Sequence, residues 1–253
     1  MGDDSTPRTV LSLARGREMM YDVIPLKGDK YTVNESHILS LRSSVNQSKK
    51  IKKGTIIDIP LVDYLNLPKS YHGRGGPLLG YRVGIDFPKR KIDLEPYFLG
   101  YWLGDGNSIN VGITTIEECV IDYYTNYAKK LDLKIRKCDS NGTKEGRSKN
   151  KILNMLQKHK LINNKHIPQE YKCNTREIRL ELLAGIIDSD GSLSNNCYDI
   201  IQKNEKLLDD IIYLARSLGF AAYKTKCEKS CIYKTEKKIG CLLYTSPSPR
   251  DNL

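Results

Sequence analysis

The sequence predicts a two-part protein, with an all-β unit at the N-terminus followed by an α/β domain built from two similar halves. Three observations predict this class. Two short apolar segments, residues 99–106 and 183–191, each end in an aspartate followed by glycine. Each segment is followed by the same order of β-prone stretch, amphipathic helix and basic stretch. Before residue 60 the chain consists instead of short β-like runs separated by turn residues.

Short β-like runs dominate the N-terminal unit, which we place at about residues 1–85. Turn residues such as Gly28 and Asn34 separate the runs. Residues 61–67 predict one short helix, and residues 68–93, which contain several Pro and Gly, predict a connector. Many short strands with little helix are typical of a small all-β fold. The expected strands are residues 9–13, 20–24, 30–33, 37–41 and 53–60.

The two apolar segments predict a pair of helices in close contact. Residues four apart lie on the same side of a helix. Gly100 and Gly104 therefore share one face of the first helix, and Gly185 and Ser189 share one face of the second. Small side chains at this spacing let two helix backbones approach closely. We expect these four residues to form the helix interface.

An aspartate follows the small residues in each segment. If the helices pack side by side, their C-terminal ends meet and bring Asp105 next to Asp190. Two carboxylates held close repel each other unless a cation lies between them. Carboxylate oxygens are hard ligands, so the pair predicts a divalent cation such as Mg²⁺. The alternative is two ordinary buried helices, although an acid in the last helical turn opposes the helix dipole.

The segments after the two motifs repeat, in residues 113–138 and 200–227. In each, apolar residues recur at helical spacing before a basic, strand-like stretch. The repeat predicts a domain over residues 86–240, with halves of about 94–180 and 181–240 related by a pseudo-twofold axis. Such a protein suits a roughly twofold site on a duplex. Because both halves lie in one chain, we expect a monomer.

The two motifs resemble those of the LAGLIDADG homing endonucleases. The second copy departs from the family's letters only at Ile186, which replaces Leu, and Ser189, which replaces Ala. The resemblance implies site-specific, metal-dependent cleavage of both strands of duplex DNA, with Asp105 and Asp190 as the catalytic, metal-binding acids. Lys165, in the sequence Lys-His-Ile-Pro between the motifs, resembles the lysine block of intein-borne members. That lysine is expected to stabilise charge on phosphorus or to help deprotonate the attacking water.

The charge balance favours a nucleic-acid partner. Lys and Arg total 41 against 30 acidic residues, which gives a formal net charge of +11 and a pI near 9.2. Such a chain binds polyanions through phosphate contacts, although charge alone does not distinguish DNA from RNA. Basic residues cluster near the expected strands, and strands of this kind lie in the major groove in the family. The expected DNA contacts are Lys134, Arg136, Lys137, Lys149, Lys224 and Lys226.

Residues 30–41 resemble the histidine block of the Hint fold, the protein-splicing domain of inteins. His37 stands at the family's histidine, and Asn34 stands where the family usually has Thr. The resemblance implies that His37, with Asn34 nearby, assists the N–S acyl shift, and that host-protein flanks (exteins) adjoin the full-length protein. The first splicing nucleophile and the terminal Asn are not encoded here. We therefore expect an incomplete Hint domain that does not splice in this form.

Residues 241–253 match neither the repeat nor a Hint block. Their reverse translation resembles a sequencing-library adaptor, so we expect an artefact and leave the segment out of the expected fold. The seven cysteines show no C-x-x-C spacing, and we find neither a signal peptide nor a long apolar run. We expect an intracellular protein, in the cytoplasm or nucleus, that is neither secreted nor inserted in a membrane.

Two other functions stay open from the sequence. The chain could be a splicing element whose endonuclease-like insert is inactive, or a DNA-binding module of the same fold without catalysis. The presence of both motif acids, Asp105 and Asp190, argues against simple decay of an endonuclease. Cleavage of DNA with and without Mg²⁺ separates these functions.

Overall fold

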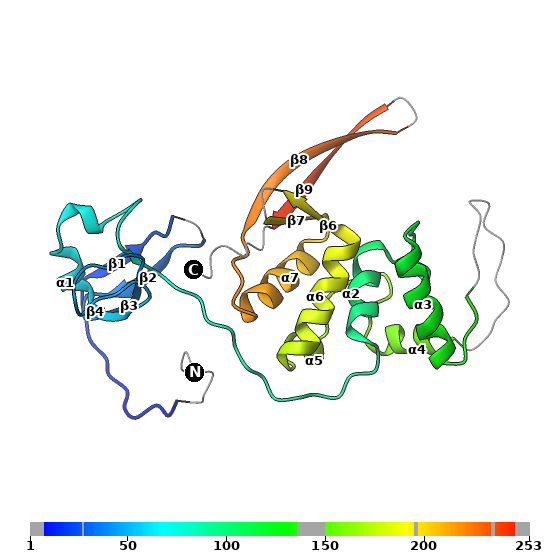
Figure 1. Ribbon diagram of the computed structural model, residues 1–253, viewed down its shortest axis with the longest axis horizontal. Coiled ribbons are helices and arrows are strands. Elements are labelled where there is room, and N and C mark those ends of the chain that lie inside the picture. The colour runs from blue at the N-terminus through cyan, green and yellow to red at the C-terminus, as the bar shows by residue number, and fades with distance from the viewer. Residues whose placement is uncertain (1–7, 27, 136–149, 195–196, 234–235, 246–253) are drawn as a thin grey trace.

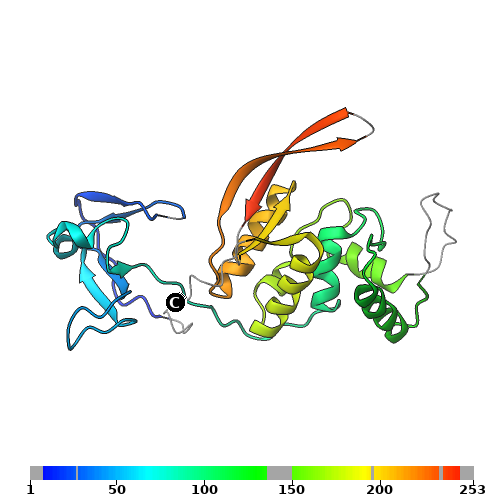
Figure 2. The same ribbon diagram turned by 45° about the horizontal axis from the view of Figure 1, so that its top comes forward.

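The molecule consists of N-terminal strands, an extended segment, and a helical body from which a long β-hairpin projects (Figure 1). Figure 2 shows the same hairpin standing away from the helices after a rotation of the view. The computed structural model describes the backbone of residues 8–26, 28–135, 150–194, 197–233 and 236–245, and their side chains up to Thr225.

The N-terminal strands form two small antiparallel sheets. Strand β1 (Met20–Val23) pairs with β2 (Tyr31–Asn34). In the other sheet β3 (Ile38–Ser43) lies between β4 (Ile56–Pro60) and β5 (Leu78–Leu79). The predicted strands near β1 to β4 are therefore confirmed. A small core, formed by Val33, Leu39 and Leu61, lies among these elements.

One predicted strand is wrong. Residues 9–13 carry no strand in the structure, and Val10 and Leu11 are 74% and 92% exposed. β-prone side chains stabilise a strand only where a neighbouring strand and a core surface cover them, and neither lies beside this segment. The predicted short helix is confirmed as α1 (Leu61–Leu65), which is followed by a 3₁₀ turn, η1 (Lys69–Tyr71).

Two helices, α2 (Pro96–Asp105) and α6 (Arg176–Asp190), pack against each other at the centre of the body (Figure 1). The amphipathic helices that the apolar stripes predict are confirmed. They are α3 (Glu118–Lys130) and α7 (Glu205–Ser217), and Gly219 ends the second with a φ of +89°. The shorter helices are α4 (Lys151–Lys158) and α5 (Gln169–Lys172).

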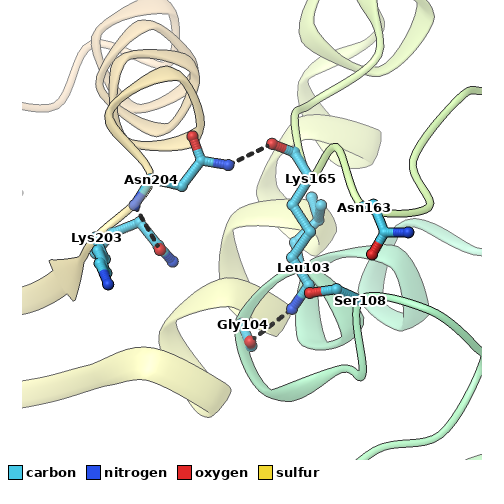
Figure 3. Close-up of a pocket in the computed structure, with 8 residues that line it drawn as sticks. Leu103, Gly104, Ser108, Asn163, Lys165, Lys203 and Asn204 are labelled. Atoms are coloured by element: carbon cyan, nitrogen blue, oxygen red, sulfur yellow. Dashed lines mark hydrogen bonds between the residues drawn. The ribbon is translucent and has the colours of Figure 1, made fainter.

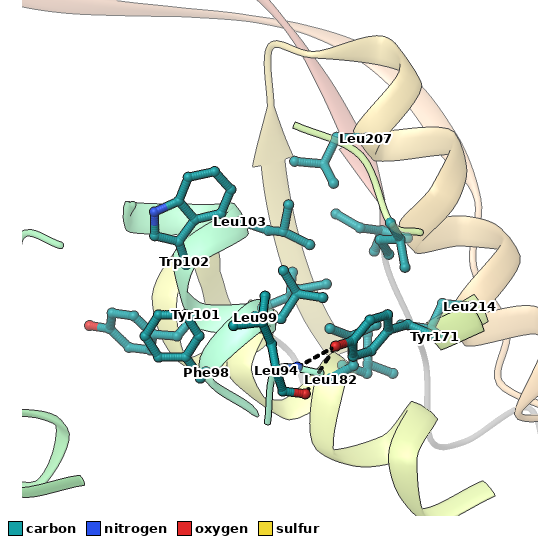
Figure 4. Close-up of a cluster of buried hydrophobic side chains, with 14 of the residues drawn as sticks. Leu94, Phe98, Leu99, Tyr101, Trp102, Leu103, Tyr171, Leu182, Leu207 and Leu214 are labelled. Atoms are coloured by element: carbon teal, nitrogen blue, oxygen red, sulfur yellow. Dashed lines mark hydrogen bonds between the residues drawn. The ribbon is translucent and has the colours of Figure 1, made fainter. Parts of the chain in front are cut away.

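A single large core joins these helices. Leu99 and Trp102 of α2 and Leu182 of α6 are completely buried (Figure 4). Tyr171 is also completely buried, and its hydroxyl exchanges hydrogen bonds with the backbone N–H and carbonyl of Leu94. The hydroxyl therefore satisfies two backbone groups just before α2, which fixes where that helix begins.

A four-stranded antiparallel sheet follows α6, in the order β6-β7-β9-β8. Its strands are β6 (Gly191–Ser194), β7 (Cys197–Gln202), β8 (Lys224–Tyr233) and β9 (Glu236–Thr245). Residues 241–245, which we left out of the expected fold, belong to β9 and pair with β8, and Thr245 also pairs with Ile200 of β7. Residues 241–245 are therefore part of the sheet.

The two motif helices are followed by similar but unequal structures. After α2 comes an isolated bridge between Gly106 and Ile113 and then α3. After α6 come the paired strands β6 and β7 and then α7. The basic segment after α3 is described only to residue 135 and carries no strand up to that point. The order of elements is shared, and the pseudo-twofold relation stays a prediction.

The segment that we expected to be a plain connector is attached to the rest of the fold at several points. Leu78–Leu79 forms β5 and pairs with β3. Farther along, the Ile85 N–H donates to the carbonyl of Ser217 at 2.8 Å. Arg179 of α6 is completely buried, donates to the Ile85 carbonyl, and lies 5.0 Å from the Phe87 ring centre. These contacts attach residues 85–87 to α6 and α7.

Candidate active site

The interface between α2 and α6 depends on small residues. A Cβ added to Gly100 would collide with the carbonyl oxygen of Leu182, and one added to Gly185 would collide with that of Tyr97. A Cβ on Gly104 would meet the side chain of Ser189. Contacts this close leave no space for a larger side chain. The four residues expected at the helix interface thus face the partner helix.

The two helices end side by side at Asp105 and Asp190. Each aspartate is the last residue of its helix, and the chain then continues in an extended conformation through Gly106 or Gly191. Neither glycine has a positive φ. A Cβ on either would instead strike the preceding helical turn, at the carbonyl oxygen of Trp102 or Ile187. The glycine after each acid is therefore required for space.

The carboxylates of Asp105 and Asp190 lie in one partly buried environment. The Asp190 carboxyl carbon is 3.2 Å from the position a Cβ would take on Gly104, the residue before Asp105. Burial and, to a smaller extent, the charge of Asp105 raise the pKa of Asp190 to about 6, against the lowering effect of Lys165. Burial also raises the pKa of Asp105, against the lowering effect of Lys165. The two acids therefore share one lysine as their nearby cation.

Lys165 lies across the end of α2. Its Nζ donates to the carbonyl oxygens of Gly104 at 2.9 Å and Gly106 at 2.7 Å, and lies 5.2 Å from the Trp102 ring centre. Burial lowers the pKa of this lysine, and the charges of Asp190 and Asp105 oppose that shift. A cation here satisfies carbonyls at a helix C-terminus and offsets the unfavourable placement of two acids at helix ends.

A pocket of about 420 Å³ opens beside Lys165 (Figure 3). Polar side chains from several elements line it, and none of them except Lys165 was expected from the sequence. Asn204 precedes a helix, which identifies it as a helix cap. Its bond to the carbonyl of Lys165 is a tertiary contact with no sequence signal. The lining residues are Leu103, Gly104, Ser108, Asn163, Lys165, Gln202, Lys203 and Asn204.

The donors at the helix ends fit a hard divalent cation. Asp105 and Asp190 each end a helix, the Asp190 carboxyl lies against the end of α2, and the charges of the two carboxylates interact. Mg²⁺ is usually held by one or two carboxylates together with water and substrate phosphate. Among the described residues no set of three or more His, Cys, Asp or Glu could enclose a metal ion. The arrangement suits an open site that a phosphate completes.

The two residues of the histidine block belong to the N-terminal unit, far in the sequence from the two aspartates. His37 is exposed just before β3, and its backbone N–H donates to the carbonyl of Asn34 at 3.1 Å. The Asn34 side chain, at the end of β2, donates to Glu18 and to Ser36. His37 and Asn34 therefore lie at the two ends of one backbone turn between β2 and β3.

The expected DNA-contacting residues lie in different settings. Lys134 is exposed after α3, and Lys226 lies in β8. Lys224 donates to Glu205 at 2.7 Å and to Asp209 at 2.8 Å, so its charge is already shared with two acids of α7. The remaining expected contacts, Arg136, Lys137 and Lys149, lie outside the described residues.

Comparison with known proteins points to DNA cleavage. Residues 166–247 match the family model of homing endonucleases, which supports a DNA endonuclease function with DNA as partner. That match includes Asp190, and it extends into residues 241–247, part of the segment left out of the expected fold. Within the described part of the chain, no helix is long and apolar enough to cross a bilayer.

A replicative helicase also resembles this chain. The replicative DNA helicase DnaB of Mycobacterium intracellulare is 30% identical over 170 residues, which cover 62% of this chain and 27% of the helicase. The chain therefore spans far less than two thirds of that relative's length. The similarity is therefore to one part of a longer helicase.

Proposed function

We propose that this chain is a site-specific endonuclease that cuts both strands of duplex DNA by metal-dependent hydrolysis. The observation that carries the proposal is the meeting of two aspartates, Asp105 and Asp190, at the ends of helices whose glycines permit close packing. A lysine, Lys165, lies against the same helix end. Partly buried like charges beside a lysine are typical of a functional site.

Asp105 and Asp190 would hold the cation, for which we propose Mg²⁺. A bound divalent cation supplies a water of lowered pKa and stabilises charge on the attacking and leaving oxygens. Lys165 holds a positive charge at the carbonyls of Gly104 and Gly106, where it can stabilise negative charge on a phosphate in the pocket. The Trp102 ring lies beside the lysine ammonium, whose positive charge it can stabilise.

DNA is proposed to lie along the sheet that follows α6. The β8–β9 hairpin projects from the body and carries several lysines (Figure 1). We keep Lys134 and Lys226 as proposed phosphate contacts. Lys224 is a weaker candidate, because Glu205 and Asp209 already neutralise it. We propose that the chain acts as a monomer, since both acids come from one chain.

We also propose that residues 1–85 belong to a Hint protein-splicing domain within an intein. The support is the small β-rich unit, the place of Asn34 and His37 in a turn between two of its strands, and the partial similarity to a replicative helicase, which we propose as the interrupted host. His37 would hydrogen-bond the peptide at the first splice junction, with host-protein flanks on either side of the full-length protein. Such a protein acts inside the cell.

The endonuclease proposal is tested on a negatively supercoiled plasmid. The plasmid carries the gene of the helicase relative from which the segment matching this chain has been removed, because an endonuclease encoded within a host gene acts on the uninterrupted gene. The full chain in Mg²⁺ is expected to yield linear plasmid, and EDTA to prevent it. Binding without any cut would favour the non-catalytic module, and neither binding nor cutting would favour an inactive insert.

The splicing proposal is tested in a precursor in which a Hint relative supplies the rest of the domain. His37→Ala is expected to slow thiol-induced cleavage at the first junction, because the histidine assists the acyl shift. His72→Ala is the matched control, since His72 lies in the same unit and its ring contacts the Leu67 carbonyl and the Tyr64 ring. Equal rates for the two variants would remove the basis for a Hint domain.

A further inference from the structure

A path of hydrogen bonds joins Asp190 to Lys165 through the junction of β7 and α7. Gln202, the last residue of β7, donates from Nε2 to Asp190 Oδ2 at 3.1 Å. Its Oε1 accepts from the Asn204 N–H at 3.1 Å. The Asn204 side chain then donates from Nδ2 to the Lys165 carbonyl at 2.9 Å (Figure 3). Gln202 and Asn204 thus connect the acid of α6 with the backbone of the lysine.

The path continues from Lys165 to the end of α2. The lysine Nζ donates to the carbonyls of Gly104 and Gly106, on either side of Asp105. A lysine side chain is long and flexible, so the position of its ammonium depends on how firmly its backbone is held. Residues 202 and 204 therefore join the ends of the two helices that carry the acids.

Other bonds hold the loop of Lys165 from both sides. The Asn163 N–H donates to the Ser108 carbonyl at 2.7 Å. The Ile167 N–H donates to Asp210 Oδ2 of α7 at 2.8 Å. Between these two bonds, the Asn204 side chain donates to the carbonyl of Lys165 itself. Loss of the Asn204 contact would free the lysine carbonyl while leaving the loop attached at its flanks.

The Asn204 side chain has two separable contacts. Its Oδ1 accepts from the Leu207 N–H at 3.2 Å and so caps α7. Its Nδ2 makes the bond to Lys165. Serine is about as good a helix cap as asparagine, but its hydroxyl is too short to reach the lysine carbonyl. Asn204→Ser therefore keeps the cap and removes the contact with Lys165.

We propose that Asn204 and Gln202 are positioning residues for DNA cleavage, Asn204 acting through Lys165 and Gln202 acting through Asp190. This inference rests on the endonuclease function proposed above. Residues that orient active-site groups by hydrogen bonds, without touching the substrate, commonly contribute roughly 10–100-fold to metal affinity or activity.

The test compares two serine variants of the full chain on the supercoiled plasmid in single-turnover reactions. Asn204→Ser is expected to lower the cleavage rate about 10–100-fold with unchanged DNA affinity and melting temperature. Asn150→Ser is the matched control, because Asn150 caps α4 through Ile152 and Leu153 and shows no bond to Lys165 in the described structure. Gln202→Met is expected to raise the Mg²⁺ concentration needed for half-maximal cleavage.

A second measurement does not depend on cleavage. Acylation of lysines, followed by mass spectrometry, reports how accessible each amine is, and the exposed Lys206 serves as internal reference. Asn204→Ser is expected to raise the relative labelling of Lys165 several-fold. Wild-type labelling of Lys165, or a cleavage rate equal to that of Asn150→Ser, would overturn the proposal. If Lys165→Met and Asp190→Asn cleave normally, the proposed function itself fails, which is a different outcome.

Discussion

The Lys165 ammonium donates a hydrogen bond of 2.9 Å to the carbonyl oxygen of Gly104, within the last turn of α2. The same ammonium bonds the Gly106 carbonyl, so one cation bridges the residues on either side of Asp105. This relationship explains how a helix can end in an acid despite its dipole. It also means that the lysine has a structural effect as well as a proposed chemical one.

Lys165→Met is expected to abolish cleavage and to destabilise the fold. Removal of the ammonium leaves two partly buried carbonyls and two acids without their cation, which costs about 1–3 kcal/mol. Thermal unfolding and plasmid cleavage measure the two effects separately. Lys160→Met is a control, because Lys160 precedes the same loop and is exposed. Wild-type stability and activity in Lys165→Met would contradict the geometry.

Gly185→Leu is expected to destabilise the protein by about 1–3 kcal/mol or more, because the side chain would overpack the contact of α6 with Tyr97 on α2. Ala184→Leu is the matched control, since Ala184 is the preceding residue of the same helix and is exposed. Its effect is expected within about 0.5 kcal/mol. Chemical denaturation measures both. Similar effects of the two changes would mean that Gly185 does not face α2.

The protonation of Asp190 is expected to make stability depend on pH. Because burial raises its pKa from 3.8 to about 6, the folded state binds the proton more tightly than the unfolded state does. Its contribution to stability is therefore present below pH 3.8 and is lost as pH rises through about 6. Without divalent cation, Asp190→Asn should be about 1–2 kcal/mol more stable than wild type at pH 8, after allowance for solvent screening.

That stability difference should disappear as the pH falls well below 3.8, where the wild-type carboxyl is protonated in both states. Thermal unfolding in EDTA across this pH range measures it. Asp188→Asn, an exposed residue of the same helix, is the control and should show no such gain above pH 6. An Asp190→Asn variant that is less stable than wild type at pH 8 would contradict the burial of this acid.

DNA affinity is expected to fall steeply with salt. A protein that makes about 6–10 phosphate contacts loses about 10³–10⁵ in affinity between 50 and 200 mM salt, because it releases counterions from the duplex. Lys226→Ala should reduce this slope by about one unit, whereas Lys224→Ala should change it less, since Glu205 and Asp209 already pair with Lys224. Fluorescence anisotropy measures the slopes. A flat dependence would contradict DNA binding through phosphates.

The central helices and their contacts could be predicted because local signals agree there. Small residues four apart predict close packing, and Gly100 and Gly185 do contact backbone on the opposite helix. The apolar stripes of α3 and α7 likewise predict helices with one buried face. In these segments the residue pattern alone determines which face is covered.

Other features depend on contacts between distant segments, and so the sequence does not reveal them. The run at residues 9–13 has strand propensity but no partner strand. Gln202 and Asn204 are ordinary polar residues until the fold places them between Asp190 and Lys165. The pairing of Lys224 is likewise absent from the sequence pattern. Its two partners, Glu205 and Asp209, lie one turn apart on α7 and meet it only in the fold.

The most direct test of the account compares Asp190→Asn with Asp188→Asn in plasmid cleavage with Mg²⁺. Both changes remove one charge from α6, but only Asp190 lies at the helix end beside Lys165, while Asp188 is exposed and accepts from the Tyr97 hydroxyl. The account predicts that Asp190→Asn binds DNA and produces no linear plasmid, and that Asp188→Asn cuts like the wild type. Linear plasmid formed at the wild-type rate by Asp190→Asn would contradict it.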